Sequence, residues 1–319
     1  MNKIAFTTPS SLSRRDFLRA GLGGGGMILL AGCAGDSRTR GTEELAKGYI
    51  DAHVHIWTDD TERYPLGPGS SKPTSPPTFT AEELLKLARP AGVTRVVLIH
   101  IGYYGVDNSY MVDMMRQYEG VFAGVAIIDQ KDEPRAKMVE LGRQGVRGFR
   151  ISPPAENESD WLNSESMATM WKCGADEGLS MCLLMNPEQL PLVDKMCQKY
   201  PGTPVVIDHL ARIGLKEIRQ KDIDNLCKLA RHKQVTVKAS AFYALGKKKA
   251  PYLDLAPLIR RVLDCFGPER VMWATDCPFQ AMNGHTYQDS VALISERLDF
   301  LTEGDREWIL RKSAERVFF

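Results

Sequence analysis

One sequence pattern repeats through the chain after residue 48, and it restricts the fold more than any other feature. Short runs of apolar and β-branched residues alternate with longer segments in which apolar residues recur at helical spacing. The short runs, which predict strands, occupy residues 49–56, 94–102, 122–129, 146–152, 179–185, 203–209, 234–240 and 270–276. Strands that alternate with helices form parallel sheets, because each helical crossover returns the chain to the same edge.

Eight such units in residues 48–319 predict a (β/α)8 barrel, the TIM-barrel fold, built as a single domain. The alternative is an open doubly wound sheet, which needs a glycine-rich phosphate loop after its first strand. The segment HVHIWTDDTERYPLG stands in that place, so the barrel is favoured. The net charge of +1 argues against a nucleic-acid binder, which would normally carry a basic surplus, and indicates a small-molecule partner instead.

Chemically active side chains gather where the predicted strands end, which is where barrel enzymes carry their active sites. Four of the six histidines lie at these ends, namely His53, His55, His100 and His209. The other polar residues at these ends are Asp129, Arg150, Ser152, Asn186, Lys238, Ser240 and Asp276. Histidines scattered through a core would not cluster in this way, so the pattern predicts an active site at this end of the barrel.

The first predicted strand, within YIDAHVHIW, places His53 and His55 two residues apart. Side chains i and i+2 of a strand point to the same side, about 6–7 Å apart, so both imidazoles can reach one cation. Asp276 arrives from the eighth strand beside the first, and it can bind a metal or act as the base that activates water. His209 lies within reach from the sixth strand, and Asp51 is expected to orient an imidazole.

Five more residues at the strand ends are candidates for contacts with the substrate. Arg147 and Arg150 have odd spacing and therefore point oppositely. Arg150, nearer the mouth, would bind a carboxylate or polarise a carbonyl if it faces inward. The alternative for Arg150 is a surface contact with a helix. The alternative for Lys238 is that it is buried and pairs with a carboxylate. The candidate set is Arg150, His100, Tyr103, Asn186 and Lys238.

Three segments, YIDAHVHIW, VVIDHL and RVMWATDCPF, resemble the amidohydrolase superfamily. The resemblance is greatest to its amidohydrolase-related (amidohydrolase 2) group of TIM-barrel metal-dependent hydrolases, and PEQLP and FGPERVMWATDCPF are similar to its lactonase-like branch. It covers nearly all of residues 48–319 and implies that Asp276 takes a proton from water. His209 and Arg150 complete the predicted catalytic set, the latter from its place at the end of the fourth strand. The metal ligands that the resemblance implies are His53, His55, His209 and Asp276.

Two departures from that group bear on the metal. The fourth strand, VRGFRIS, ends without the lysine that holds a second metal in many members. The fifth strand ends LLMN, so Met185 and Asn186 stand where many members have a histidine. We therefore expect one zinc ion or no metal.

The resemblance and the candidate residues together predict a hydrolase that opens a lactone of a sugar acid or of another carboxylate. Two alternatives stand beside it. The same site would decarboxylate or hydrate a small carboxylic acid, or the chain would be a non-catalytic barrel lipoprotein.

The N-terminal segment predicts export. Arg14 and Arg15 precede the weakly hydrophobic stretch GLGGGGMILLAG, which is the layout of a twin-arginine signal, and LAGC resembles a lipoprotein cleavage box. Residues 1–32 are therefore interpreted as a signal peptide and residues 33–47 as a tether. A lipid on Cys33 would be the only membrane attachment of a periplasmic or cell-envelope protein.

The remaining six cysteines form no CxxC pair. We interpret them as small buried hydrophobes. The sequence does not decide whether two of them form a disulfide in an oxidising compartment.

Overall fold

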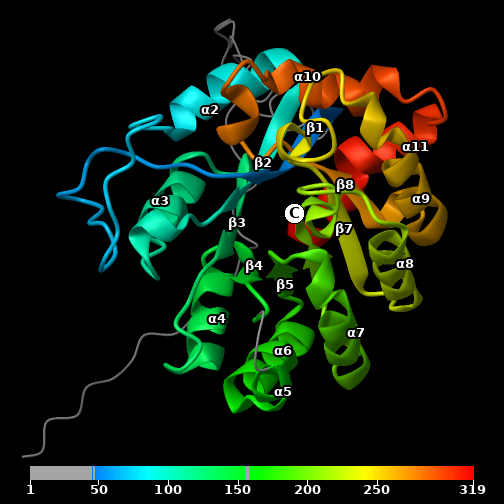
Figure 1. The fold of residues 1–319 in the computed structure, drawn as a ribbon. Coiled ribbons are helices and arrows are strands. Elements are labelled where there is room, and N and C mark those ends of the chain that lie inside the picture. Colours follow the sequence, from blue (N-terminus) through cyan, green and yellow to red (C-terminus); the bar gives the residue numbers. More distant parts are fainter. Residues whose placement is uncertain (1–44, 46, 155–157) are drawn as a thin grey trace, which may run out of the picture.

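The computed structural model describes Leu45 and residues 47–154 and 158–319. Within these residues, eight parallel strands pair in the order β1 to β8. They span Tyr49–Val54 (β1), Val93–Ile99 (β2), Phe122–Ala126 (β3), Val146–Ile151 (β4), Ser180–Leu183 (β5), Val205–Ile207 (β6), Val235–Ala239 (β7) and Val271–Trp273 (β8). The predicted (β/α)8 barrel is thereby confirmed (Figure 1). The predicted signal peptide and nearly all of the tether lie outside the described residues.

Helices follow the strands and surround the barrel (Figure 1). None of the helices in the described part of the chain combines the length and apolar character that crossing a bilayer requires. The helices span Ala81–Ala88 (α2), Ser109–Gln117 (α3), Pro134–Arg143 (α4), Glu158–Asn163 (α5), Glu165–Glu177 (α6), Leu190–Lys199 (α7), Gln220–Lys228 (α8), Ala256–Phe266 (α9), Tyr287–Ala292 (α10), Glu303–Glu307 (α11) and Ser313–Phe318 (α12).

Local sequence signals set several helix ends. Thr80 and Glu83 form a reciprocal capping box at the start of α2, which satisfies two backbone N–H groups that the helix leaves unpaired. Ser164 caps the start of α6, and Gly178 ends that helix at a φ of 66°. A glycine adopts this left-handed conformation without the steric cost that a side chain would add.

The barrel closes where the chain segment after β8 meets β1. Val54 and Cys277 form a parallel bridge. Asp276 N–H donates to the carbonyl of His53, and His55 N–H donates to the carbonyl of Cys277, both at 2.9 Å. This backbone seam brings the ends of the first and last strands together.

Asp51 supports the same seam from the opposite side of β1. Its buried carboxylate accepts hydrogen bonds from the Thr275 backbone N–H (2.9 Å), the Thr275 hydroxyl (2.5 Å) and the Tyr287 hydroxyl of α10 (2.7 Å). A register shift in β1 between Asp51 and Val54 breaks the alternation on which the sequence argument relied. The prediction that Asp51 orients an imidazole is therefore wrong, because it ties β1 to β8 and α10 instead.

The barrel interior is apolar at the end opposite these strand termini. Phe318 and Ala314 of α12 pack against apolar side chains of the barrel strands, and Figure 1 marks the C-terminus near the barrel centre. Their partners in this cluster are Ile50, Ala52, Val97, Ile99, Ala123, Val125, Cys182, Val206, Met272 and Ala274. Since this end is plugged, the polar groups lie toward the other end.

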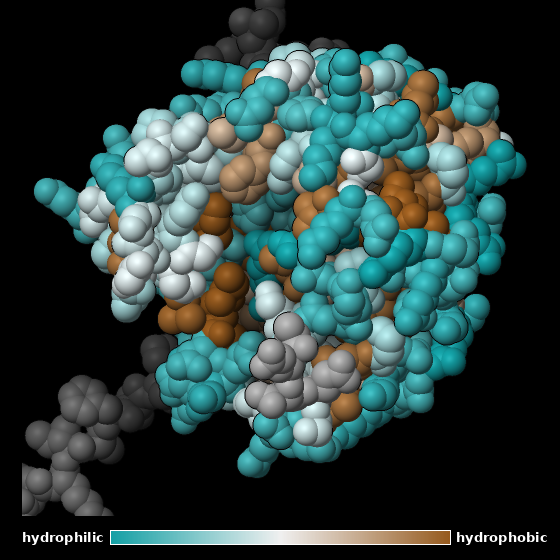
Figure 2. All heavy atoms as spheres, viewed as in Figure 1, coloured by the Kyte–Doolittle hydropathy of each residue, from teal (hydrophilic) through white to brown (hydrophobic). Residues whose placement is uncertain are grey.

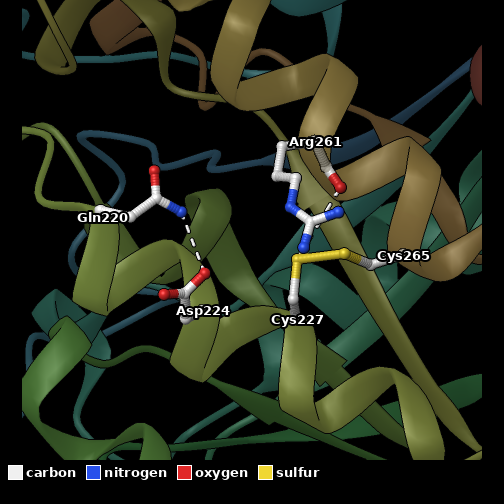
Figure 3. The surroundings of a disulfide bond; sticks show 5 residues. All are labelled: Gln220, Asp224, Cys227, Arg261 and Cys265. Atoms are coloured by element: carbon white, nitrogen blue, oxygen red, sulfur yellow. Dashed lines mark hydrogen bonds between the residues drawn. A yellow bond between two sulfur atoms is a disulfide. The ribbon is translucent and has the colours of Figure 1, made fainter.

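The cysteines divide into two groups. Cys227 of α8 and Cys265 of α9 form a disulfide with their Cα atoms 5.6 Å apart, so it joins two neighbouring outer helices (Figure 3). The free cysteines of the described chain are all buried, namely Cys173, Cys182, Cys197 and Cys277. The interpretation as small buried hydrophobes is thus confirmed for these four and wrong for Cys227 and Cys265.

We expect Asp51→Ala to lower the free energy of unfolding by at least about 2 kcal/mol. The change leaves the buried donors of Thr275 and Tyr287 without their acceptor, and each such loss costs about 1–3 kcal/mol. Chemical denaturation of the purified protein measures the effect. Asp299→Ala, at an exposed position, is the control and should change stability little. Equal stability of the two variants would contradict this role for Asp51.

Candidate active site

Three imidazoles and one carboxylate meet at the C-terminal end of the strands. His53 lies in β1 and His55 directly follows it, while His209 and Asp276 lie in the segments that follow β6 and β8. Asp276 Oδ1 lies 3.2 Å from His55 Nε2, 3.5 Å from His53 Nε2 and 3.9 Å from His209 Nε2. The structure therefore brings together the four residues that were predicted as metal ligands, and all four are buried.

Hydrogen bonds orient two of these rings. His55 Nδ1–H donates to the Ile99 carbonyl at 2.8 Å, and His209 Nδ1 lies 2.9 Å from the Ser240 hydroxyl. The Nε2 atoms of both rings consequently face Asp276.

The spacing of the ligand atoms fits one divalent metal. Bonds of about 2.1 Å in a tetrahedral site separate the ligand atoms by about 3.4 Å. His53 Nε2 lies 3.3 Å from His55 Nε2, and the distances to Asp276 bracket the same value. His53, His55 and Asp276 together form a buried group that can hold a metal ion.

The electrostatics also suit a metal or a base. Burial raises the pKa of Asp276, but the neighbouring His209, His55 and His53 outweigh it and bring that pKa below its usual range. Burial lowers the pKa of His53 and of His209. At neutral pH the site therefore holds an ionised carboxylate beside the neutral imidazoles of His53 and His209, which are the forms that bind metal.

The backbone is strained where it carries these groups. His209, Leu210, Ala211 and Arg212 have φ values of 53°, 52°, 53° and 58°, and Asp276 has a φ of 70°. Left-handed backbone costs a residue with a side chain about 1–2 kcal/mol. Leu210 and Ala211 are fully buried, so core packing holds the turn in place. Strain of this kind concentrates at functional sites.

Lys238 does not lie in the pocket as the sequence argument expected. It is fully buried beneath His53, with its Nζ 3.1 Å from Asp208 Oδ1 and 3.3 Å from His53 Nδ1. The alternative reading, in which a buried lysine pairs with a carboxylate, describes its position. Burial raises the pKa of Asp208, but Lys238 and His53 outweigh it, and that pKa lies well below its usual range.

A cavity of about 350 Å³ opens above the imidazoles. His55, His209 and Asp276 form part of its lining. The other groups are two cations, two aromatic rings and several small or aliphatic side chains: Arg150, Arg212, Tyr243, Phe279, Leu184, Leu215, Leu245, Ala241 and Ala244. The space-filling view shows a largely hydrophilic face on which hydrophobic side chains gather around a central recess (Figure 2).

Of the residues predicted to contact the substrate, Arg150 lines this cavity. His100 is buried nearby, and its Nε2–H donates to the Gly105 carbonyl at 2.9 Å. Tyr103 packs edge-on against Trp57. Asn186 borders a neighbouring cavity. Among the described residues, His100, Tyr103 and Asn186 therefore lie outside the lining of the cavity that holds the imidazoles.

Three residues of the site were not predicted from the sequence. Asp208 lies directly before His209, and Arg212 and Tyr243 lie three residues beyond the predicted ends of their strands. The Tyr243 hydroxyl donates to Asp276 Oδ2 at 2.7 Å. The polar residues that follow a strand end were the available signal, but the turns that bring them inward leave no periodic pattern.

Known proteins resemble this chain over most of its length. A family model described as Amidohydrolase matches residues 50–319. A 4-sulfomuconolactone hydrolase from Hydrogenophaga intermedia is 27% identical over 279 residues, which cover 86% of this chain and 89% of that protein. An L-fucono-1,5-lactonase from Burkholderia ambifaria is 27% identical over 240 residues, which cover 74% of this chain and 82% of that protein.

A solved amidohydrolase from Burkholderia multivorans, with bound zinc, has the same fold. Its TM-score is 0.70 at 21% identity, and the match covers 85% of this chain and 98% of that one. At this identity the likeness concerns the fold.

We expect the purified chain to bind about one zinc ion when zinc is supplied, because the two groups of described residues that could hold an ion share His53. His53→Ala/His55→Ala should abolish this binding. Elemental analysis after gel filtration measures the metal per chain. His232→Ala removes an imidazole that pairs with Asp194 elsewhere and serves as the control. Zinc retained by the double variant at the wild-type level would contradict the ligand assignment.

Proposed function

Because the chain belongs to the amidohydrolase family, we propose that it hydrolyses a lactone that carries an anionic group such as a carboxylate. One observation carries this proposal: Asp276, His55 and His209 form the floor of a cavity that also holds two arginines, and His53 contacts Asp276 from beneath that floor. The relatives named as lactone hydrolases support the same reaction.

Asp276 is the proposed general base. Its Oδ1 takes a proton from a water molecule while the water oxygen forms a bond to the lactone carbonyl carbon. The ring carbon–oxygen bond then breaks, the departing oxygen receives the proton from Asp276, and the product is a hydroxy acid. The Tyr243 hydroxyl holds Oδ2 at 2.7 Å, which leaves Oδ1 directed toward the reacting atoms.

The residues present fit a divalent metal, and we propose zinc held by His53, His55, His209 and Asp276. When bound, such an ion polarises the carbonyl and makes water more acidic. Without one, the neutral imidazoles and the arginines are the groups available to stabilise the oxyanion.

Two arginines are placed to hold the substrate. Arg150 and Arg212 line the cavity from β4 and from the turn after β6. A guanidinium binds a carboxylate through two parallel hydrogen bonds, so the pair fixes an anionic group. Phe279, Leu184 and Leu245 provide apolar surface for a ring. A small anionic lactone matches this lining better than a neutral one.

Asp276→Asn should lower kcat/KM for an anionic lactone by about 10²–10⁴-fold, because the base is lost while the side-chain shape is kept. A pH indicator that follows acid release measures turnover over a panel of lactones. Asp129→Asn is the matched control, since Asp129 is exposed and also follows a strand. Carbon dioxide release from a carboxylic acid, without turnover of any lactone, would favour the decarboxylase alternative. No turnover of either class would favour the non-catalytic one.

Arg150→Met and Arg212→Met should each raise KM for an anionic lactone by about 10–100-fold, the loss expected for a charged hydrogen bond. A neutral lactone of equal size should show a smaller change. Arg147→Met is the control on the same strand, because Arg147 bonds the Gly142 and Val146 carbonyls. Equal effects of Arg150→Met and Arg147→Met would contradict the assignment.

We also propose that the chain is exported by the twin-arginine route and held in the cell envelope by a lipid on Cys33. The N-terminal sequence motivates this, and the disulfide between α8 and α9 supports an oxidising compartment (Figure 3). Cys227 and Cys265 are partly exposed and join the outer faces of two helices. The bond can therefore form after the barrel has folded, as export of a folded chain requires.

Full-length protein should fractionate with the cell envelope, and Arg14→Lys/Arg15→Lys should retain it in the cytoplasm. Thiol labelling under denaturing conditions should then detect two more free thiols in the retained protein, because Cys227 and Cys265 stay reduced there. Cys33→Ala, the control for lipidation, should release exported protein in soluble form. Envelope localisation that survives the double arginine change would contradict the twin-arginine route.

A further inference from the structure

A buried ion pair lies directly beneath the imidazole of His53. Lys238 of β7 and Asp208, which follows β6, have no exposed surface, and Lys238 Nζ stands 3.1 Å from Asp208 Oδ1. Burying two charges is costly even when they are paired. Neither group reaches the cavity, so any part that they play in the chemistry passes through His53.

His53 Nδ1 is contacted by both members of the pair. Lys238 Nζ lies 3.3 Å away, and Asp208 Oδ1 lies 3.4 Å away. An ammonium group only donates hydrogen bonds and a carboxylate only accepts them. The two neighbours consequently favour opposite tautomers of the same ring.

The other two imidazoles have no pair of opposite charges at Nδ1. His55 Nδ1 faces the Ile99 carbonyl, an acceptor only, and so must carry its proton there. His209 Nδ1 lies 2.9 Å from the Ser240 hydroxyl, which also lies 3.5 Å from the Lys238 carbonyl, and a hydroxyl can donate or accept. His55 thus keeps a lone pair on Nε2, and His53 is the ring whose Nδ1 lies between two groups of opposite charge.

Lys238 and Asp208 differ in whether they form a hydrogen bond with His53. Lys238 Nζ and His53 Nδ1 meet the distance and angle of a hydrogen bond, whereas neither oxygen of Asp208 has a hydrogen-bond partner among the described residues. A fully buried carboxylate without a hydrogen-bond donor is rare, and the group is ready to accept one. His53 Nδ1–H is the nearest ring donor that could supply it.

We propose that Asp208 and Lys238 are positioning residues that set the tautomer of His53, and through it the ability of the site to hold a metal. When Lys238 donates to Nδ1, the ring proton sits on Nε2 and donates to the Nε2 lone pair of His55, 3.3 Å away, with Asp276 Oδ1 at 3.5 Å. When Nδ1–H donates to Asp208, Nε2 presents a lone pair to a metal. The ring is neutral in both arrangements, so the exchange moves a proton between its nitrogens and leaves the charge unchanged.

This inference deepens the proposed function, since it rests on the proposed metal site. It also explains how one chain can present either a metal ligand or a hydrogen-bond donor at the same ring nitrogen. Asp208 acts as an attractive charge behind the metal site, and Lys238 opposes a second cation in the position beneath it.

The test is nitrogen NMR of the full chain labelled on histidine, recorded without metal and with one equivalent of zinc. His53 should carry its proton on Nε2 without metal and on Nδ1 with zinc. His55 should stay protonated on Nδ1 throughout and is the internal reference. An unchanged tautomer of His53 in the presence of bound zinc would overturn the proposal.

Two variants separate the roles of the pair. Asp208→Asn should weaken zinc binding by about 10–100-fold in competition with a chelating dye, as is typical for partners of a metal-bound histidine. Lys238→Met should place the His53 proton on Nδ1 even without metal. This second result needs neither zinc nor lactone turnover, so it distinguishes a failure of this inference from a failure of the proposed function.

A matched double variant controls for folding. Asp208→Asn/Lys238→Met removes both charges together, and thermal unfolding shows whether either single variant fails only because one charge is left unpaired. If Lys238→Met folds and His53 keeps its proton on Nε2, Lys238 does not set the tautomer. If neither single variant folds, the wild-type comparison with and without zinc decides.

Discussion

The seam between β1 and the segment after β8 is the constraint on which the site depends. Two backbone hydrogen bonds, from Asp276 N–H to His53 and from His55 N–H to Cys277, fix the register of residues more than 200 positions apart in the chain. Because both bonds lie at the residues that carry the chemistry, closing the barrel and assembling the site are one event. Asp51 reinforces this seam from the outer side.

The barrel interior consists of successive layers of side chains, which begin with the apolar residues of α12 and become polar toward the cavity. Phe318 closes the bottom and also packs beneath Lys238, whose Nζ lies 5.4 Å from the ring centre. The buried pair of Lys238 and Asp208 forms the next layer, and His55, His209 and Asp276 form the floor of the cavity. Each layer fixes the one above it, so the strained turns after β6 and β8 are held from below and from the sides.

The fold was predictable because its signals are local. Alternation along strands and helical spacing depend on neighbours within a few residues, and caps such as Thr80 and Gly178 mark ends directly. The strand ends were placed less well: the sixth strand was expected at residues 203–209 but spans Val205–Ile207. There the chain enters a left-handed turn at His209, which no apolar pattern marks.

The sequence alone determined the eight-fold rhythm, the barrel, and the collection of His53, His55, His209 and Asp276 at one end of it. Tertiary structure decided the rest: that Lys238 lies beneath the site, that Asp208 joins it, that Arg212 and Tyr243 turn into the cavity, and that Cys227 meets Cys265. The physical reason is that these contacts depend on register, on a bulge in β1 and on positive-φ turns. Those features follow from closure of the whole barrel and produce no periodic pattern in the local sequence.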